Sequence, residues 1–254
     1  MIKMIYLLYL ITGLLAGIIG GLLGTGGCAL MMPVMRFGFC FEPAVAVGTT
    51  LTAVFFTAAS GALQHVKMKN VEKKTAQIIA CSGALGIVIG SMVFSYIKNY
   101  GKVLDMLLGF IFFLVALRMI YEGILLKKHP AVLKNKISEK KITKGLLGSL
   151  VGFLTGIVGL GGGYLLVPSF VFLKMPLPLA IGTSMASFVW IVLMGALWKI
   201  YQGTVNFSAA FSIGLGASIG AIYGARLVAK FKPNILKTVF GLFFLYVSLK
   251  YVFL

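Results

Sequence analysis

The sequence predicts an all-α polytopic membrane protein made of two pseudo-symmetric halves, each with a glycine-rich helix break. Apolar residues make up 60% of the 254-residue chain and charged residues only 11%, whereas a soluble domain has roughly 25% charged residues. Apolar runs of about 20 residues, the length at which a helix crosses a bilayer, recur along the chain. Motifs of the first half return in the second half, and the alternating pattern of a membrane β-barrel is absent.

The glycine-rich stretch from Gly20 to Pro33 recurs 135 positions later, from Thr155 to Pro168. Both copies lie inside apolar sequence, and neither can hold a regular helix because each glycine costs about 1 kcal/mol relative to alanine. The apolar sequence around the first copy, Ile5–Phe39, would measure roughly 50 Å as one helix, far more than a hydrocarbon core of about 30 Å. We therefore expect two shorter helices that meet at the glycines in each half.

Each half then consists of four full or broken helical segments. In the first half the broken segment comprises Ile5–Leu23 and Cys28–Phe39, and Pro33 removes one hydrogen bond from its second piece. The unbroken spans of this half are Ala44–Leu63, Thr75–Ile97 and Leu104–Ile124.

The chain divides at a lysine-rich linker. We assign residues 1–124 to an N-terminal transmembrane repeat, residues 125–144 to a basic cytoplasmic linker and residues 145–254 to a C-terminal transmembrane repeat. The second repeat preserves the glycine pattern of the first, and a two-fold repeat in an apolar chain is typical of secondary transporters. The matching positions are Gly13, Gly17 and Gly21 with Gly148, Gly152 and Gly156, Gly48-Thr49-Thr50 with Gly182-Thr183-Ser184, and Gly86 and Gly90 with Gly220 and Gly224.

The distribution of charge favours inverted repeats. If each broken segment is a single crossing, the repeats have four spans and run parallel; if it forms two elements, they have five and run in opposite directions. In the second case the linker and the loops around Lys67–Lys74 and Arg226–Lys237 share one side, which then carries most of the lysine and arginine residues. By the positive-inside rule that side is cytoplasmic, and both termini lie outside the cell membrane.

Several function classes are disfavoured by the sequence. The net charge of +18 would suit a nucleic-acid-binding protein, but the cations lie in loops between spans, where membrane orientation requires them. We therefore expect the lipid bilayer, and not nucleic acid, as a partner. The sequence contains no HExxH motif and no paired carboxylates, and its three cysteines form no Cys/His ligand set. An enzyme, a metal site and a cofactor are therefore not expected.

Two kinds of glycine pattern have different expected roles. Glycines spaced four residues apart let membrane helices approach closely, and we assign them to packing. Packing does not need consecutive glycines, and a nucleotide loop would need a following Lys-Ser/Thr pair. The dense runs are therefore expected to form a nest of backbone N–H groups at the start of a short helix, which favours an anionic substrate. The residues of this predicted site are Gly24, Thr25, Gly26, Gly27, Cys28, Gly159, Gly161, Gly162 and Gly163.

Hydroxyl groups follow each glycine run, near the start of the next span. Each hydroxyl can donate to an oxyanion without adding charge, or it can bond a carbonyl one turn back in its own helix. Their repetition in both halves favours the substrate site. The residues concerned are Thr49, Thr50, Thr183 and Ser184.

Few charged groups lie within or beside the spans. Lys98, Lys174 and Lys199 could assist an anion, although snorkelling of their amines to the membrane interface is favoured. Asp105 lies near the end of a span and is expected to be solvated. No chain of buried acids and histidines indicates a proton relay.

In each copy, Gly-x-Gly-Gly is followed by proline six residues after the last glycine, and then by Gly-Thr-Thr or Gly-Thr-Ser. This duplicated pattern resembles that of the sulfite exporter TauE/SafE family, and the resemblance covers essentially the whole chain. It implies a multi-pass plasma-membrane carrier for small sulfur-containing anions such as sulfite, thiosulfate and sulfonates. Cys28 stands where the second copy has Gly163, so a thiol there could narrow the cavity or meet a sulfur substrate, with packing as the expected role.

Three functions are compatible with these patterns. We favour a secondary transporter, working as an exporter, that passes a small anion between the two halves by alternating access. The alternatives are an anion channel on the same scaffold and a membrane subunit with a structural or docking role through its basic loops. The patterns leave a homodimer open.

Overall fold

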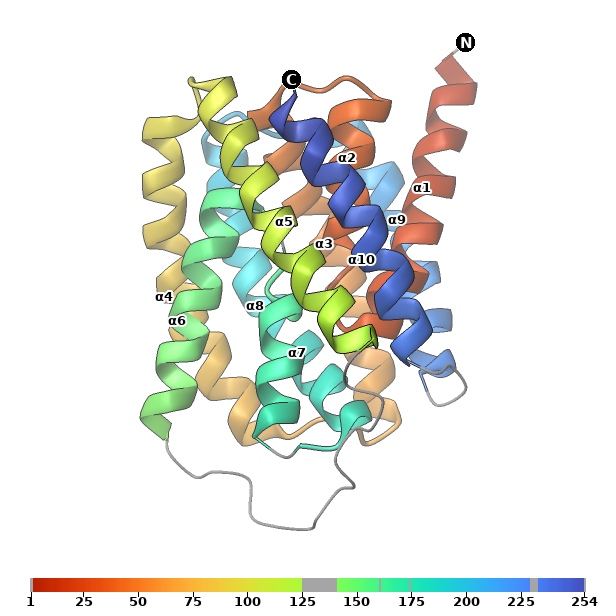
Figure 1. The fold of residues 1–254 in the computed structure, drawn as a ribbon, viewed down its shortest axis with the longest axis vertical. Helices are drawn as coiled ribbons and strands as arrows, with labels where there is room; N and C mark the ends of the chain where they lie inside the picture. Colours follow the sequence, from red (N-terminus) through yellow and green to blue (C-terminus); the bar gives the residue numbers. More distant parts are fainter. Residues whose placement is uncertain (1, 125–140, 160, 174, 229–232, 254) are drawn as a thin grey trace.

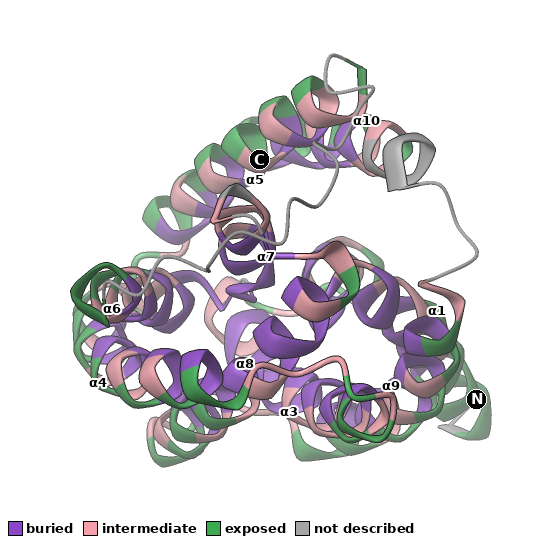
Figure 2. Cartoon of the chain, turned by 90° about the horizontal axis from the view of Figure 1, so that it is seen from below, coloured by how far each residue is buried: buried purple, intermediate pink, exposed green. Residues whose placement is uncertain are grey.

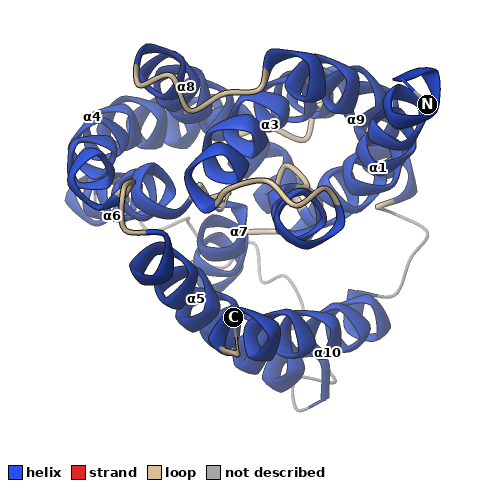
Figure 3. Ribbon diagram, turned by 90° about the horizontal axis from the view of Figure 1, so that it is seen from above, coloured by secondary structure: helices blue, strands red, loops and turns tan. Residues whose placement is uncertain are grey.

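The structure is a computed structural model that describes residues 2–124, 141–159, 161–173, 175–228 and 233–253, and these ranges are helical apart from short connections (Figure 1, Figure 3). Seven of the helices are long and apolar enough to cross a membrane, so the prediction of an all-α polytopic membrane protein is confirmed. The first repeat contains α1 (Ile2–Leu23), α2 (Cys28–Pro33) with the π-helical turn η1 (Val34–Gly38), α3 (Pro43–Lys67), α4 (Lys73–Ile97) and α5 (Gly101–Ile124). The second repeat contains α6 (Lys141–Val158), α7 (Gly163–Phe172), α8 (Leu177–Tyr201), α9 (Phe207–Leu227) and α10 (Pro233–Val252).

Both glycine runs break the helical path where the sequence predicts a break. The first break separates α1 from α2, and the second separates α6 from α7. In Figure 1, α1 runs downward and the chain then turns back upward through α2 to reach the start of α3. Each broken segment is therefore a hairpin of one long and one short helical piece, as in the five-element arrangement.

Corresponding helices of the two repeats run in opposite directions (Figure 1). The α1 helix starts at the upper end of the molecule and α6 at the lower end, while α5 ends at the lower end and α10 at the upper end. The helix ends that flank the basic loops therefore lie together at the lower end, which is consistent with inverted repeats. Residues 125–140 of the predicted linker lie outside the described residues, and α6 already begins at Lys141.

The two repeats exchange helices in space. The α1 helix packs along α9 of the other repeat, and α4 packs along α6. With α3 and α8 these pairs form two bundles, α1–α3–α9 and α4–α6–α8, which contact each other through α3 and α8. The α5 and α10 helices form a third pair to one side of both bundles (Figure 2, Figure 3). Buried residues gather where the bundles meet, and exposed residues lie on the outward faces (Figure 2).

The glycines spaced four apart make these close contacts, as the sequence predicts. A Cβ atom at Gly17 would overlap the main chain of Ala217 on α9, and a Cβ at Gly152 would overlap that of Gly83 on α4. The same holds for the rest of both ladders, because the helices approach until main chain touches main chain. The other glycines whose added Cβ would meet main chain across these pairs are Gly13, Gly21, Gly86, Gly90, Gly156, Gly216, Gly220 and Gly224.

The expectation that Asp105 is solvated is wrong. Its carboxylate is buried and accepts two hydrogen bonds from Arg36, at 3.0 Å from Nε and 2.7 Å from Nη2. Arg36 also donates to the carbonyl oxygen of Phe41 at 3.1 Å. The pair connects η1 to the start of α5. Loss of either partner would leave the other charge buried and unpaired, at a cost of several kcal/mol.

Candidate functional site

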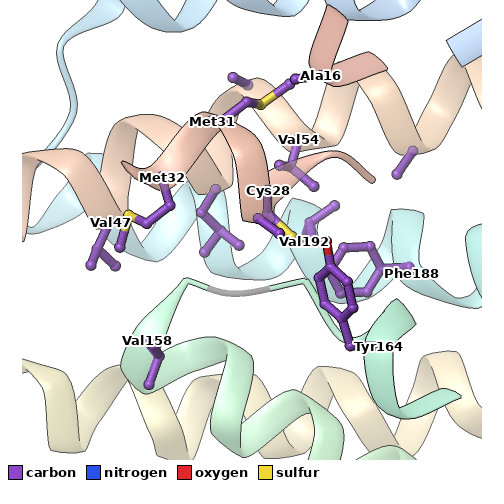
Figure 4. Close-up of a cluster of buried hydrophobic side chains, with 14 of the residues drawn as sticks. Ala16, Cys28, Met31, Met32, Val47, Val54, Val158, Tyr164, Phe188 and Val192 are labelled. Carbon is purple, nitrogen blue, oxygen red and sulfur yellow. The ribbon is translucent and has the colours of Figure 1, made fainter. Parts of the chain in front are cut away.

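The two glycine-rich breaks meet inside the molecule and form what we call the glycine junction, residues 24–28 with residue 159 and residues 161–163. The backbone N–H of Gly161 donates to Cys28 Sγ at 2.7 Å, and the Cys28 thiol donates to the Thr25 carbonyl oxygen at 3.2 Å. A Cβ atom at Gly163 would overlap the carbonyl oxygen of Gly24 and the Cα of Thr25. The sequence predicted that both runs serve one site, and the structure brings their main chains into contact (Figure 4).

Backbone conformation explains why these positions are glycine. The φ angles are 71° at Gly24, 72° at Gly26, 77° at Gly27 and 68° at Gly159, in the left-handed region that costs other residues roughly 1–2 kcal/mol. These turns reverse the chain within a few residues, so α2 and α7 both begin at the junction. The first N–H groups of a helix lack partners within it, and its dipole is positive at that end. The junction therefore concentrates hydrogen-bond donors at a buried spot.

The walls of the junction come from equivalent positions on the two central helices. Val54 lies on α3 and Phe188 on α8, and both are buried. The ring of Phe188 lies so close that a Cβ at Gly161 would be 3.2 Å from its Cε1 atom, and a Cβ at Gly26 would be 2.8 Å from Val54 Cγ1. Any side chain larger than hydrogen at these glycines would therefore displace a wall.

The four predicted hydroxyls divide into two groups, and each has a partner outside its own helix. Ser184 reaches the junction, where its Oγ donates to the Gly24 carbonyl oxygen at 3.2 Å. Thr50 lies beside α2 and donates to Met35 Sδ at 3.4 Å. The hydroxyl oxygens of Thr49 and Thr183 instead accept hydrogen bonds from the main chain at the start of a neighbouring helix.

Thr49 and Thr183 fasten the start of a neighbouring helix in a symmetric way. Thr49 Oγ1 accepts a hydrogen bond from the N–H of Asn206, the N-cap of α9, at 3.0 Å. Thr183 Oγ1 accepts one from the N–H of Glu72, the N-cap of α4, at 2.9 Å. Their repetition in the sequence therefore reflects the symmetry of the two bundles, and their substrate role has no contact with the junction to support it.

Two polar atoms at the junction lack a partner in the described part of the chain, namely Thr25 Oγ1 and the hydroxyl of Tyr164. Both side chains are buried, and the two groups lie near each other without the geometry of a hydrogen bond. Figure 4 shows the hydroxyl end of Tyr164 pointing toward Cys28. Sequence reasoning missed Tyr164 because the first repeat has alanine at the equivalent position, Ala29.

The predicted role of the lysines needs one correction. Lys199 does not snorkel to the interface: its side chain is 0% exposed and its amine lies 2.9 Å from the centre of the Phe94 ring. Lys98 donates to the Gln202 carbonyl oxygen at 3.4 Å. Lys174 lies outside the described residues.

The family of the chain follows from comparison with known proteins. Residues 9–251 match the family described as "Sulfite exporter TauE/SafE". The chain belongs to the TauE/SafE family. It is 28% identical to "Probable membrane transporter protein YunE" of Bacillus subtilis, with 91% of each chain covered. It is 30% identical to a "Probable membrane transporter protein" of Xylella fastidiosa, with 94% of this chain and 91% of the relative covered.

A further relative is "Probable membrane transporter protein MJ0441" of Methanocaldococcus jannaschii, 28% identical over 90% of this chain and 86% of its own. No solved structure matches the chain. The family and the helices together make this TauE/SafE protein a multi-pass membrane transporter. The names of its relatives describe transporters and not enzymes.

Proposed function

We propose that this TauE/SafE protein exports small sulfur-containing anions, such as sulfite, thiosulfate or sulfonates, across the cell membrane. The observation that carries the proposal is the glycine junction, where two helix breaks from opposite repeats meet at one buried spot. In this proposal the basic loops are cytoplasmic and both termini lie outside, in keeping with the positive-inside rule.

The junction offers hydrogen-bond donors without a full charge. Backbone N–H groups at the starts of α2 and α7 form the anion site, and the hydroxyls of Thr25 and Tyr164, which lack partners among the described residues, complete it. Ser184 fixes the Gly24 carbonyl, so that this acceptor is turned toward α8 instead of toward the anion. A neutral set of donors binds an oxyanion and still releases it, which a carrier requires at every cycle.

Alternating access takes place between the bundles and not between the halves of the sequence. Because α1 packs with α9 and α4 with α6, each moving body combines helices from both repeats. The junction joins these bodies, since α1 leads into the first break and α6 into the second. A tilt of one bundle against the other about the α3–α8 contact exposes the junction to one side at a time.

Transport by the full-length protein in proteoliposomes tests the proposal. We expect uptake of radiolabelled sulfite or thiosulfate and accelerated counterflow when the vesicles contain the same unlabelled anion. Uptake without counterflow would indicate the channel on the same scaffold. No uptake from a panel of sulfite, thiosulfate, sulfoacetate and taurine would refute the proposed substrate class.

A matched pair of glycine variants links transport to the junction. Gly161→Val places a side chain against Cys28 and Thr25, whereas Gly145→Val lies in α6 where an added Cβ has nothing within 4 Å. We expect Gly161→Val to abolish uptake and Gly145→Val to retain it. Equal uptake by the two variants would show that the anion does not pass the junction.

A further inference from the structure

One basic side chain in the core has no counter-ion among the residues that the structure describes. Lys199 lies near the end of α8, is 0% exposed, and its amine has no hydrogen-bonding partner among the described residues. The contact that its amine does make is with the face of the Phe94 ring, 2.9 Å from the ring centre. An aromatic face stabilises a cation only in part, and a buried ammonium without a counter-charge costs several kcal/mol.

The acids of the described chain are occupied elsewhere. Asp105 pairs with Arg36 and Glu122 with Arg118, and Glu72 caps the start of α4 by accepting from the N–H of Thr75. Glu42 lines a cavity at the end of the molecule, and no ion pair joins it to Lys199. No acid in the described part of the chain pairs with Lys199, so its amine is available to a bound anion.

A second polar group without a partner lies on the helix that contacts Lys199. Ser91 precedes Phe94 by one turn of α4; it is fully buried, and its hydroxyl has no partner among the described residues. The same turn of α4 touches α6 just below the second break, because a Cβ at Gly156 would be 2.7 Å from the Ser91 nitrogen. The Ser91 main chain therefore lies about one helical turn from the second break, and Phe94, whose ring contacts the Lys199 amine, lies one turn further along α4.

On its other side, this cluster leads toward the end of the molecule. The side-chain amide of Gln202, the residue that caps the end of α8, donates to the Ser91 carbonyl oxygen at 3.0 Å and to Ser95 Oγ at 2.6 Å. The main-chain carbonyl oxygen of Gln202 accepts a hydrogen bond from Lys98. Lys98 in turn lines a cavity of about 400 Å³. The remaining residues that line this cavity are Glu42, Pro43, Ala44, Asn99 and Gly101.

The other repeat has a basic residue at the equivalent position. Lys199 follows His65 by 134 positions, the same offset that relates Gly182 to Gly48. His65 is also 0% exposed, and neither ring nitrogen has a hydrogen-bonding partner within the described ranges; the main chain of Gly21 lies near it, but without hydrogen-bond geometry. Gly21 is the repeat equivalent of Gly156. Two repeats of different local sequence therefore each bury, at equivalent positions, a basic side chain that has no hydrogen-bonding partner among the described residues.

We propose that Lys199, with the hydroxyl of Ser91, forms a second anion site between the glycine junction and the cavity at the upper end of the molecule, and that the transported oxyanion is its counter-ion there. The inference rests on the proposed function and adds a residue that supplies full charge outside the neutral junction. In this proposal His65 occupies the equivalent position between the junction and the lower end of the molecule. The anion thus moves between donors of alternating strength and is not trapped at any one.

The test compares Lys199→Gln with Lys199→Arg in full-length protein, with radiolabelled sulfite and thiosulfate as the probes. We expect Lys199→Gln to raise the concentration for half-maximal counterflow about tenfold or more, the loss typical of one charge-assisted hydrogen bond. Lys199→Arg retains the charge and should stay within about threefold of the wild type by the same measure. Wild-type half-saturation in Lys199→Gln overturns the inference.

Two matched lysines control for charge and for burial. Lys102 is exposed near the same end of the molecule, so Lys102→Gln reports any general effect of surface charge. Lys144 is buried like Lys199 but donates to Thr75 Oγ1 at 2.7 Å, so Lys144→Gln reports the loss of a buried lysine that already has a partner. We expect neither control to change half-saturation, and an equal rise in Lys102→Gln counts against a specific site.

Thermal stability separates binding from packing. Sulfite or thiosulfate should raise the Tm of the wild type in detergent, and this rise should be lost in Lys199→Gln, while the Tm without anion stays equal or increases because an unpaired buried charge is gone. A lower Tm with an unchanged anion response would instead show a packing role. If Lys199→Gln does not fold, Ser91→Ala decides: about a threefold rise in half-saturation is expected for a lost neutral hydrogen bond, and no change overturns the inference.

The result also separates the two proposals. If the wild type transports and Gly161→Val does not, but Lys199→Gln behaves as wild type, the second site fails and the junction stands. If the wild type transports none of the tested anions, the proposed function fails and this site with it.

Discussion

A single methyl group at Gly163 should separate the two halves of the glycine junction. The added Cβ would overlap the carbonyl oxygen of Gly24 and the Cα of Thr25, and both are main chain, so no side-chain rotation can make room. Overpacking of this kind costs typically 1–3 kcal/mol. At about 2–4 °C per kcal/mol for a chain of this size, Gly163→Ala should lower the Tm by roughly 2–12 °C.

The assay combines a thermal unfolding curve in detergent with counterflow in proteoliposomes. Two alanine variants isolate the other effects of a lost glycine. At Gly145 in α6 an added Cβ meets nothing within 4 Å, so Gly145→Ala should raise the free energy of unfolding by up to about 1 kcal/mol. An added Cβ at Gly203 also meets nothing, but φ is 69° there, so Gly203→Ala should lower the free energy of unfolding by about 1–2 kcal/mol through backbone strain alone. We expect only Gly163→Ala to lose transport. A Gly163→Ala protein as stable and active as Gly145→Ala would refute the contact between the breaks.

Three further variants probe the contacts around the junction and the topology. Cys28→Ala removes the acceptor of the Gly161 N–H and should cost about 1 kcal/mol, measured as a lower Tm that Cys28→Ser partly restores; equal Tm values for both variants contradict a role for this hydrogen bond. Arg36→Met leaves Asp105 buried without its partner and should cost about 3–5 kcal/mol, and a Tm within error of the wild type would show that the carboxylate is solvated. Three single cysteine variants, treated with a membrane-impermeant thiol reagent, test the topology. Lys67→Cys and Arg226→Cys should be labelled from the same face of the membrane, and Asn99→Cys from the opposite face. Labelling of Lys67→Cys and Arg226→Cys from different faces rules out inverted repeats.

The sequence was sufficient for the spans, the breaks and their duplication, because each depends on local chemistry. A dense glycine run cannot continue a helix, and glycines at four-residue spacing on Gly13 to Gly21 and on Gly148 to Gly156 mark a face that another helix approaches closely. The partner of that face was not predictable. Both ladders pack on a helix from the other half of the sequence, which depends on how the two halves fit together in three dimensions.

The polar residues were harder to place from the sequence because their partners are distant in the chain. The repetition of Thr49 in the second half favoured a substrate ligand. Its hydrogen bond with the Asn206 N–H exists because α3 packs against α9, and this contact between distant segments has no signature in the sequence. Lys199 looked like an interfacial lysine because α8 ends two residues later. The packing of α4 against α8 buries that end, so position along the helix did not indicate depth in the molecule.

The exchange of helices between repeats has a consequence for biosynthesis. The glycine face of α1 packs against residues of α9 that come about 200 positions later in the chain, as in the contact of Gly17 with Ala217. At a synthesis rate of 5–20 residues per second, those residues emerge on the order of ten to forty seconds after α1 has left the ribosome. During this interval the bare ladder of small residues is open to lipid or to a wrong neighbour, so the α1–α3–α9 bundle can close only after α9 has been inserted.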